Sequence, residues 1–388
     1  MSVVGGLCLM AATVSAGPQK VVSNADLLNM INKLSQKVDQ LEKENQALKK
    51  RVESLNQKQD STEKQVAAVV VEAGPVSNMQ KEEENLTVTT EYLYWQPSLG
   101  VLDFVTNDSS STNRIRGDEI QVEPNNTAGF RIALGYEAPS NQTDLSLSLT
   151  QLDGDWSKKV KVSPGADLWG TRLHAQSVID DNNVTQATAD YEIDYMVWDV
   201  NIGYTSHIND SFEVRPYGGL RIAEIDQKFN IFYEQRITPI FRRTVDFKEV
   251  NKMSGVGLNL GIDSKWYWGL GFSLMTGVGG SLLLADTHYS QYQGDRPVGA
   301  TKDLVRVDFK RDREDQLIPV VSANMGLTWE YVFQNNMMLM FLAGYEYQNW
   351  FNIFHQVRFT DDVDSQLGSS DDSDLGIHGP FIRAKVFF

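Results

Sequence analysis

Residues 144–150 read DLSLSLT, and they place three leucines on one side of a chain whose other side is polar. Side chains of a β-strand point alternately to its two faces, so this period of two indicates a strand with one apolar and one polar face. The same alternation runs through residues 130–136 (FRIALGY) and 256–263 (VGLNLGID). The pattern predicts an all-β fold.

The alternation recurs in ten segments between Asn85 and the C-terminus. They lie near residues 85–96, 127–137, 142–152, 189–205, 212–226, 250–263, 268–285, 317–333, 336–351 and 379–388. The connections are alternately long and short, as in outer-membrane barrels with long extracellular loops and short periplasmic turns. We therefore predict a transmembrane antiparallel β-barrel of about ten strands over residues 85–388, with both ends in the periplasm.

Two details of this barrel stay open in the sequence. Residues 228–248 can form an extra hairpin, which would raise the number of strands to twelve. The fourth segment changes phase near Tyr195 and Met196. Such a change indicates either a β-bulge or a strand whose upper part stands clear of the membrane.

A soluble sandwich or a lipocalin-like barrel is the alternative, because its strands also alternate, with the apolar side chains facing inward. Against it, the face opposite the apolar one mixes charges with Gly, Ser and Asn, which suits a wet lumen. Aromatic side chains also gather near the ends of the segments, as interfacial girdles require. They are Tyr92, Tyr94, Tyr136, Tyr204, Trp266, Trp268, Trp329, Tyr331, Tyr345, Tyr347 and Trp350.

The composition excludes some classes of protein. The net charge is −16, which argues against nucleic acid as a partner because that partner requires clustered Lys and Arg. Hydrophobic residues make up 41% of the chain, and no run of about 18 apolar residues provides a membrane-spanning helix. Composition does not distinguish a soluble β protein from a transmembrane barrel, because barrel strands alternate apolar and polar residues.

The N-terminus resembles an export signal. Residues 3–16 read VVGGLCLMAATVSA, an apolar run that ends in a small-residue cleavage motif at Ala16. We predict a signal peptide over residues 1–16, although the basic segment that normally precedes the apolar run is missing. The alternative is a buried apolar terminus. Cys8 is the only cysteine, so the mature chain has no disulfide and no thiol catalysis.

Residues 24–66 predict a periplasmic coiled coil, followed by a linker over residues 67–84. Apolar residues recur at steps of four and three, with β-branched residues at one core position and Leu at the other, which favours a parallel dimer. The residues expected to hold the oligomer are Leu34, Val38, Leu41, Asn45, Leu48 and Val52. The alternative is a single amphipathic helix packed on its own barrel.

The last strand carries a predicted assembly signal. Phe388, Val386, Ala384 and Ile382 form one apolar face that ends on a terminal aromatic residue. Such a strand is similar to the signal that outer-membrane barrels present to the barrel-assembly machinery. We expect that machinery and outer-membrane lipid as partners.

Charged residues on the polar face are the candidates for a functional site, because charges can face water or one another but not lipid. They are Glu91, Arg131, Asp144, Asp199, Arg215, Arg221, Glu330, Glu346, Arg383 and Lys385. These residues either form a constriction in a narrow channel or pair with one another and plug the barrel. Ten strands lie nearer to the filled interior of eight-stranded barrels than to an open pore.

The sequence predicts no enzyme, no cofactor and no metal site. The five histidines, at His174, His207, His288, His355 and His378, show no metal-ligand spacing and no nucleophile motif. A catalytic site or a weak Ca²⁺ site in the Asp-rich loop between His355 and His378 is the minor alternative. The spacing of its acidic residues lacks the Gly and the terminal Glu of a dedicated calcium loop.

Several short motifs resemble the Legionella-type major outer membrane protein family, with chlamydia-like relatives. They are Glu91-Tyr92-Leu93-Tyr94-Trp95-Gln96-Pro97 with Leu102-Asp103-Phe104, Gly129-Phe130-Arg131 with Leu134-Gly135-Tyr136, Arg215-Pro216-Tyr217-Gly218-Gly219-Leu220-Arg221, and Gly344-Tyr345-Glu346-Tyr347-Gln348-Asn349-Trp350. The resemblance covers residues 85–388 and implies a pore-forming surface protein. It does not explain the coiled coil.

Two functions follow as hypotheses. The first is a porin-like channel for ions and small hydrophilic solutes that is also a surface-exposed structural protein. The second is a plugged barrel that acts as an adhesin or contacts a host surface through its long acidic loops. The coiled coil would either form a homo-oligomer or space the barrel from the cell wall.

Overall fold

A computed structural model describes Lys43, Lys49, Lys50 and residues 85–388, with gaps at 109–116, 139–141, 165, 180–183, 334–336 and 360–367. The described part of residues 85–388 contains fourteen β-strands. The strands are β1 (Asn85–Ser98), β2 (Asp103–Asp108), β3 (Gly117–Gln121), β4 (Thr127–Glu137), β5 (Thr143–Lys161), β6 (Asp167–Gly170), β7 (Gln186–Tyr204), β8 (Ser206–Asn209), β9 (Phe212–Arg236), β10 (Arg242–Gly269), β11 (Phe272–Arg296), β12 (Leu304–Val332), β13 (Met338–Arg358) and β14 (Ser369–Phe387).

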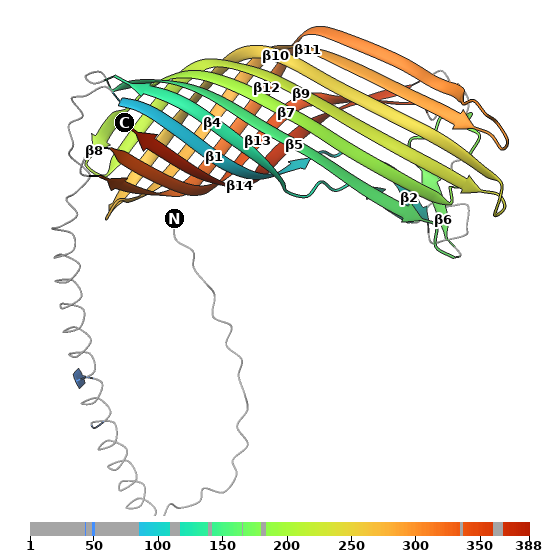
Figure 1. Ribbon diagram of the computed structural model, residues 1–388, viewed down its shortest axis with the longest axis horizontal. Coiled ribbons are helices and arrows are strands. Elements are labelled where there is room, and N and C mark those ends of the chain that lie inside the picture. Colours follow the sequence, from blue (N-terminus) through green and yellow to red (C-terminus); the bar gives the residue numbers. More distant parts are fainter. Residues whose placement is uncertain are drawn as a thin grey trace, which may run out of the picture. The chain divides into compact units, whose positions relative to one another are not determined.

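Ten of these strands form a closed antiparallel ring. Its order is β1-β4-β5-β7-β9-β10-β11-β12-β13-β14, and β14 pairs back onto β1 from Thr87↔Phe387 to Ser98↔Gly376. Figure 1 shows the long strands running from an end that holds the C-terminus and β8 to an end that holds β2 and β6. The predicted ring of about ten strands is confirmed. The alternative with twelve is wrong, because residues 228–248 extend β9 and β10 instead of forming a new hairpin in the ring.

The ring has two halves with opposite polarity, which we call the turn-end half and the loop-end half. In the turn-end half of β10, Val256, Leu258 and Leu260 are exposed on the outer face. Farther along the same strand the outer face carries Lys252 and Lys248, while Val245 and Phe247 are buried inside. Along β10 the lipid-facing side chains are therefore apolar around the turn-end half, as a lipid-facing band requires.

The apparent phase change in the fourth segment has the same origin. β7 pairs with β5 and β9 without any register shift, so it contains no bulge. Its inward side chains change from Asp199 in the turn-end half to Tyr191 and Ile193 in the loop-end half. The second of the two explanations, an upper part that stands clear of the membrane, therefore accounts for the pattern.

The sequence also predicts long loops near residues 97–126, 153–188, 227–249, 286–316 and 352–378, and this prediction is largely wrong. Residues 227–249 and 286–316 are mostly strand, and residues 153–161 extend β5. Many of their outward side chains are polar, and several inward ones, such as Phe229, Tyr233 and Phe247, are buried and apolar, although Glu249 and Gln291 also face inward. The alternation therefore continues there largely with the opposite sense, and a search for lipid-facing apolar residues reads it as loop.

A small sheet closes the loop end of the ring. β2 pairs with β3 and β6 to form a three-stranded sheet that is separate from the ring. Leu102, Phe104 and Leu168 of this region are fully buried against ring residues such as Phe229 and Tyr233. We call residues 101–108, 117–122 and 167–179 the plug, because they fill the loop-end half with an apolar core.

The aromatic girdle is nearly as predicted. Ten of the eleven predicted residues are exposed on the outer face, from Tyr92 on β1 to Tyr347 on β13. Trp350 is the exception, because it points inward, is fully buried and packs edge-on against Tyr195 at 5.8 Å between ring centroids. It lies just before the irregularity in β13 between Trp350 and Phe354, above the apolar band.

The N-terminal predictions lie outside the described residues, apart from three lysines. Lys43, Lys49 and Lys50 are helical and exposed, while the predicted signal peptide, the coiled-coil seam and the linker fall on residues that the structure does not describe. Residues 1–74 and 75–388 form two separate compact units. Within the described part of the chain, no helix combines the length and apolar character needed to cross a bilayer.

Candidate functional site: the barrel interior

The lumen of the turn-end half is lined by small polar side chains. Alternation points Ser146, Asn201 and Asn324 inward, and these residues are half-buried. Solvent therefore reaches this part of the lumen. Asn259 donates a hydrogen bond to Asn201 at 3.0 Å across β9, where the intervening residue is Gly219. A Cβ at Gly219 would lie 2.6 Å from the Asn201 amide oxygen, so glycine permits this close cross-strand contact.

Ion pairs span this part of the lumen. Arg215 contacts Asp144 on one side and Asp263 at 2.9 Å on the other. Lys385 pairs with Glu137 at 3.2 Å, and Lys265 pairs with Glu330. Each cation faces a carboxylate, so the transverse field that unpaired charges would set up is largely neutralised.

A denser charged layer crosses the middle of the barrel. Arg131 lies between Glu91 and Glu346, at 3.0 Å from each, and Arg383 contacts Glu91 at 2.7 Å. Arg131 and Glu346 are 215 residues apart in the chain, and ring closure brings them together. Both carboxylates are buried, and charge-assisted bonds of this kind hold a buried network in one geometry. We call this set, with the pair described next, the central layer.

Arg221 and Asp199 complete the central layer. The guanidinium donates two hydrogen bonds to the carboxylate, at 2.7 and 3.0 Å, in a bidentate geometry. The same guanidinium lies 5.9 Å from the ring centroid of Trp350, which forms the floor of the apolar core above. The central layer thus separates a wet lumen from a dry interior.

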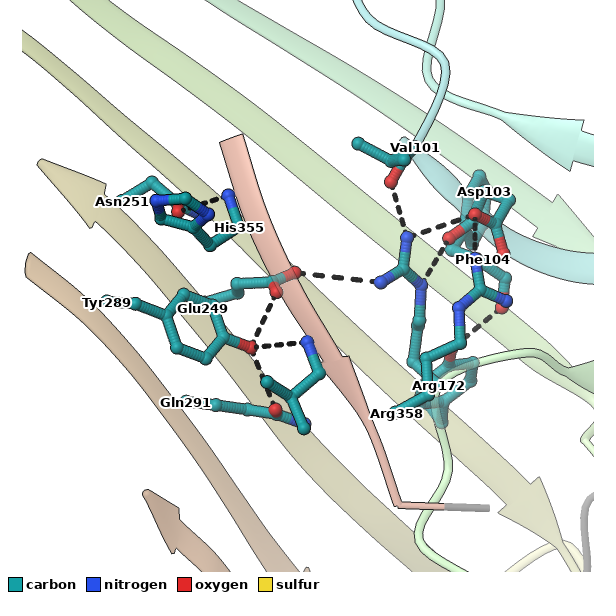
Figure 2. A network of polar contacts seen from close by, with 12 residues as sticks. Val101, Asp103, Phe104, Arg172, Glu249, Asn251, Tyr289, Gln291, His355 and Arg358 are labelled. Atoms are coloured by element: carbon teal, nitrogen blue, oxygen red, sulfur yellow. Dashed lines mark hydrogen bonds and ion pairs between the residues drawn. The ribbon is translucent and has the colours of Figure 1, made fainter. Parts of the chain in front are cut away.

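Several polar contacts fasten the plug to the ring, among them Tyr233 to the Phe104 carbonyl at 2.7 Å and the Val178 amide to Asp295 at 2.9 Å. One group of these contacts surrounds a buried cation, Arg172 (Figure 2). Its guanidinium donates to the side chain and the carbonyl of Asp103, each at 3.0 Å, and lies 3.7 Å from the Glu249 carboxylate of β10. Arg358 of β13 reaches Asp103 at 2.8 Å, and Tyr289 of β11 donates to Glu249 at 2.8 Å. We call these five residues the latch, because they join the plug to three strands of the ring.

The latch charges perturb one another. Burial opposes the ionisation of Asp103, but Arg172 and Arg358 outweigh it and hold the pKa of Asp103 below its ordinary value. Burial raises the pKa of Glu249, and Arg172 only partly offsets this. Glu249 is fully buried, and its second oxygen has no hydrogen-bond partner among the described residues. Removing Arg172 would therefore leave two buried carboxylates short of a partner.

The predicted lumen residues all lie inside the barrel, and all ten form at least one ion pair. The structure brings Glu91, Arg131, Glu346 and Arg383 into one group, and it pairs Arg215 with Asp144 and Arg221 with Asp199. The sequence analysis missed Glu137, Asp263 and Lys265, although the inward alternation of their strands points to them. It also missed the latch, because Arg172 lies in a connection without any periodicity.

The residues of the predicted assembly signal lie on the outer face of β14. Ile382 and Phe388 are exposed there, and Val386 and Ala384 are half-buried between them. Phe388 donates its amide hydrogen to the Leu86 carbonyl at 3.0 Å, so the chain ends on the seam between β14 and β1.

The histidines are dispersed. The Nδ1 atom of His355 lies 2.6 Å from an Asp372 carboxylate oxygen and 3.2 Å from the Arg313 guanidinium, inside the loop-end half. His378 contacts Tyr345 at 2.6 Å on the outer face, which separates it from His355. Asp361, Asp362 and Asp364 lie outside the described residues, and among the described residues no group of three or more His, Cys, Asp or Glu is arranged to hold a metal ion.

A family model described as Legionella pneumophila major outer membrane protein precursor matches residues 78–388. The chain belongs to the Legionella major outer membrane protein family. The match covers the whole ring, the plug and the latch, so the site described above lies within the family's region. The protein is an outer-membrane β-barrel, as the resemblance of its motifs implies. No curated protein matches the chain.

Solved outer-membrane barrels are similar to this member of the family only in a general way. The outer membrane protease OmpT of Escherichia coli has 10% identity and a TM-score of 0.34, with 81% of this chain and 98% of that chain covered. A FadL homologue of Pseudomonas aeruginosa has 8% identity and a TM-score of 0.27, with 79% and 90% covered. The translocator domain of the Neisseria meningitidis autotransporter NalP has 10% identity and a TM-score of 0.24, with 87% and 97% covered. These values support no inference about activity.

Proposed function

We propose that the protein is a porin-like outer-membrane channel for ions and small hydrophilic solutes, and that the described conformation is its closed state. The observation that carries the proposal is the half-buried Ser and Asn lining of the turn-end lumen, exemplified by Ser146, Asn201 and Asn324. A barrel that needed only a filled core would place apolar or bulky side chains there. Conduction then requires the plug and the central layer to move.

Bilayer recordings test this proposal. We expect pure, folded protein to give rare discrete conductance steps and Arg172→Met to give more frequent ones, because the substitution weakens the latch. Lys158→Gln is the matched control. Lys158 forms an exposed ion pair with Glu123 at 3.5 Å, and this pair is not part of the latch. An absence of steps from both wild type and Arg172→Met, over a range of voltages, would show that the protein is not a channel.

A second candidate function is a surface-interaction protein with a permanently closed barrel. It is supported by the loop-end half, which is polar outside, has its own apolar core and extends beyond the lipid-facing band. Shortening the β9–β10 and β11–β12 hairpins should reduce attachment of cells to a host surface. Unchanged attachment by correctly assembled variants would exclude these two hairpins as the attachment site.

The proposal assigns no reaction to the chain. His355 makes its polar contacts to Asp372 and Arg313, and its Nε2 atom is buried, so a substrate cannot reach it. We further propose that the turn end faces the periplasm, together with a coiled coil over residues 24–66, and that residues 1–16 are a signal peptide.

A further inference from the structure

Two hairpins lie side by side at the far end of the loop-end half. One connects β9 to β10 over residues 236–243, and the other connects β11 to β12 over residues 296–306. They are neighbours because β10 pairs with β11 at Thr244↔Arg296, and β11 pairs with β12 at Asp295↔Leu304. We call these two segments the tip surface.

The tip surface exposes large apolar side chains. Ile240 is 81% exposed, and Phe241 and Ile237 are each 48% exposed. Leu304 and Val305 of the neighbouring hairpin are also exposed. Within the described part of the loop-end half, the other large apolar side chains face the core or lie next to these hairpins, as Phe232 does. An exposed apolar cluster outside the lipid-facing band indicates an interaction site.

The same surface is cationic in a chain whose net charge is −16. Its six basic side chains are Arg236, Arg242, Arg243, Arg296, Lys302 and Arg306. Four carboxylates lie near them, of which Asp246 acts on Arg296 through its charge. Glu234 lies 3.4 Å from both Arg236 and Arg242, Asp303 pairs with Arg296, and Asp295 pairs with Arg306. Arg243 makes its hydrogen bond to the neutral Gln235 side chain, so a positive excess remains.

The apex of the first hairpin holds its apolar residues outward. Ile237 donates its amide hydrogen to the Phe241 carbonyl at 3.0 Å, and Phe241 donates to the Thr238 hydroxyl at 3.1 Å. These bonds close a narrow turn around Pro239 with Ile240 at its summit. A projecting apolar turn flanked by arginines has the amphipathic chemistry that binds a membrane interface.

The tip surface is too far from the protein's own bilayer to contact it. Val256 is the last exposed apolar residue of the β10 band, and Phe241 is fifteen residues farther along the strand. At a rise of about 3.3 Å per residue this is about 50 Å along the strand, or about 35 Å above the band for a tilt of about 45°. Any lipid surface that it contacts therefore belongs to a second membrane.

We propose that the tip surface binds a facing bilayer that exposes anionic lipid, with arginines at the phosphate groups and Ile240 and Phe241 inserted among the headgroups. Arginine suits this role because its guanidinium binds phosphate in a bidentate manner. Apolar insertion and attraction to anionic headgroups add to each other in interfacial binding. The proposal deepens the surface-interaction function and is independent of conduction, which the bilayer recordings test separately.

Vesicle flotation tests the proposal with the full chain held in nanodiscs of phosphatidylcholine. We expect the protein to float with vesicles that contain phosphatidylserine and not with vesicles of phosphatidylcholine alone. Arg242→Gln with Arg243→Gln should weaken binding about 30-fold. Ile240→Ser with Phe241→Ser should weaken it at least about tenfold. Lys159→Gln with Lys161→Gln removes two exposed charges of β5 outside the tip surface and should change nothing.

Three outcomes would overturn the proposal. One is equal binding to both kinds of vesicle, and another is an equal loss in the β5 control. The third is binding to soluble polyglutamate, but not to vesicles, that disappears with the arginine pair, which would identify an acidic protein as the partner. Cell attachment that persists in the tip variants would leave the broader surface function intact while removing this lipid partner.

Discussion

At the scale of the residue, Arg172 is a single buried charge that contributes to the attachment of the plug. It is the only member of the latch that comes from the connection after β6, and its side chain is 1% exposed. Asp103 arrives from 69 residues earlier, and Glu249 from the ring. Because a buried ion pair is strongly destabilised when one partner is removed, the attachment of the plug can be tested at this one position.

Arg172→Met should weaken the attachment of the plug by about 3–5 kcal/mol, because methionine preserves bulk but leaves Asp103 and Glu249 buried with less compensation. The measurement is hydrogen exchange of the amides of residues 167–179. Lys158→Gln should cost at most about 1 kcal/mol, as exposed pairs do. Unchanged protection in Arg172→Met would mean that apolar packing and the remaining polar contacts, such as Arg358 to Asp103 and Tyr233 to the Phe104 carbonyl, are enough to hold the plug.

His355 predicts a loss of stability in mild acid. Burial lowers the pKa of its imidazole from 6.5, although Asp372 acts in the opposite direction. The stabilising effect is therefore present above pH 6.5 and is lost as the pH falls from there through the lowered value. His355→Asn should reduce this pH dependence in urea unfolding, whereas His207→Asn at an exposed turn should not. An identical acid dependence in both variants would contradict the assignment.

At the scale of the element, the apolar side chains of a long strand face lipid in one half and the barrel interior in the other. The alternation of β10 was predictable from sequence over residues 256–263, because its apolar members all face lipid. The continuation through Val245 and Phe247 was not predictable, because those apolar members face inward while Lys248 and Lys252 face out. A period of two gives the faces of a strand, but not which face meets lipid, water or core.

The pairing of the lumen charges was predictable only in part. Inward alternation identifies Arg131 and Glu346 as lumen residues, but their contact depends on closure of the ring between β1 and β14 and on the register of every strand. The contacts of the latch were even less predictable, because Arg172 lies in a connection without hydrophobic periodicity. Glu249 continues the inward positions of Asn251 and Asn259, which is the one sequence signal that could have found it.

Leu258→Arg should destabilise the barrel by about 2–4 kcal/mol, because it places a charge on the lipid-facing surface of β10. Ser254→Arg, four residues along the same outer face, should cost at most about 1 kcal/mol because it lies at the edge of the band. Urea-dependent refolding into lipid vesicles measures both. Equal costs would mean that the band does not end between these residues.

Phe388→Ser should lower the amount of barrel assembled in the outer membrane, because it removes the terminal aromatic side chain from the outer face of β14. Refolding of the purified variant into lipid should be nearly unchanged, since the other strand contacts remain. A parallel loss in both measurements would show that Phe388 contributes to stability rather than to recognition by the assembly machinery.

At the scale of the whole molecule, the chain joins two units of different design. The barrel is specified by alternation and ring closure, while residues 24–66 carry a heptad pattern that predicts an oligomer. Deleting residues 24–66 should reduce the native mass of the extracted protein to that of one barrel. Asn45→Leu should leave an oligomer but loosen its register. A native mass that is unchanged by the deletion would assign oligomerisation to the barrel instead.

The inversion of polarity along the strands also protects the register of the ring. A one-residue slip of any strand turns every side chain to the opposite face. In the turn-end half such a slip would move Asn259 into lipid, and in the loop-end half it would move Phe247 into water. A misaligned strand is therefore destabilised at both ends, because it exposes polar side chains to hydrocarbon at one end and apolar side chains to water at the other.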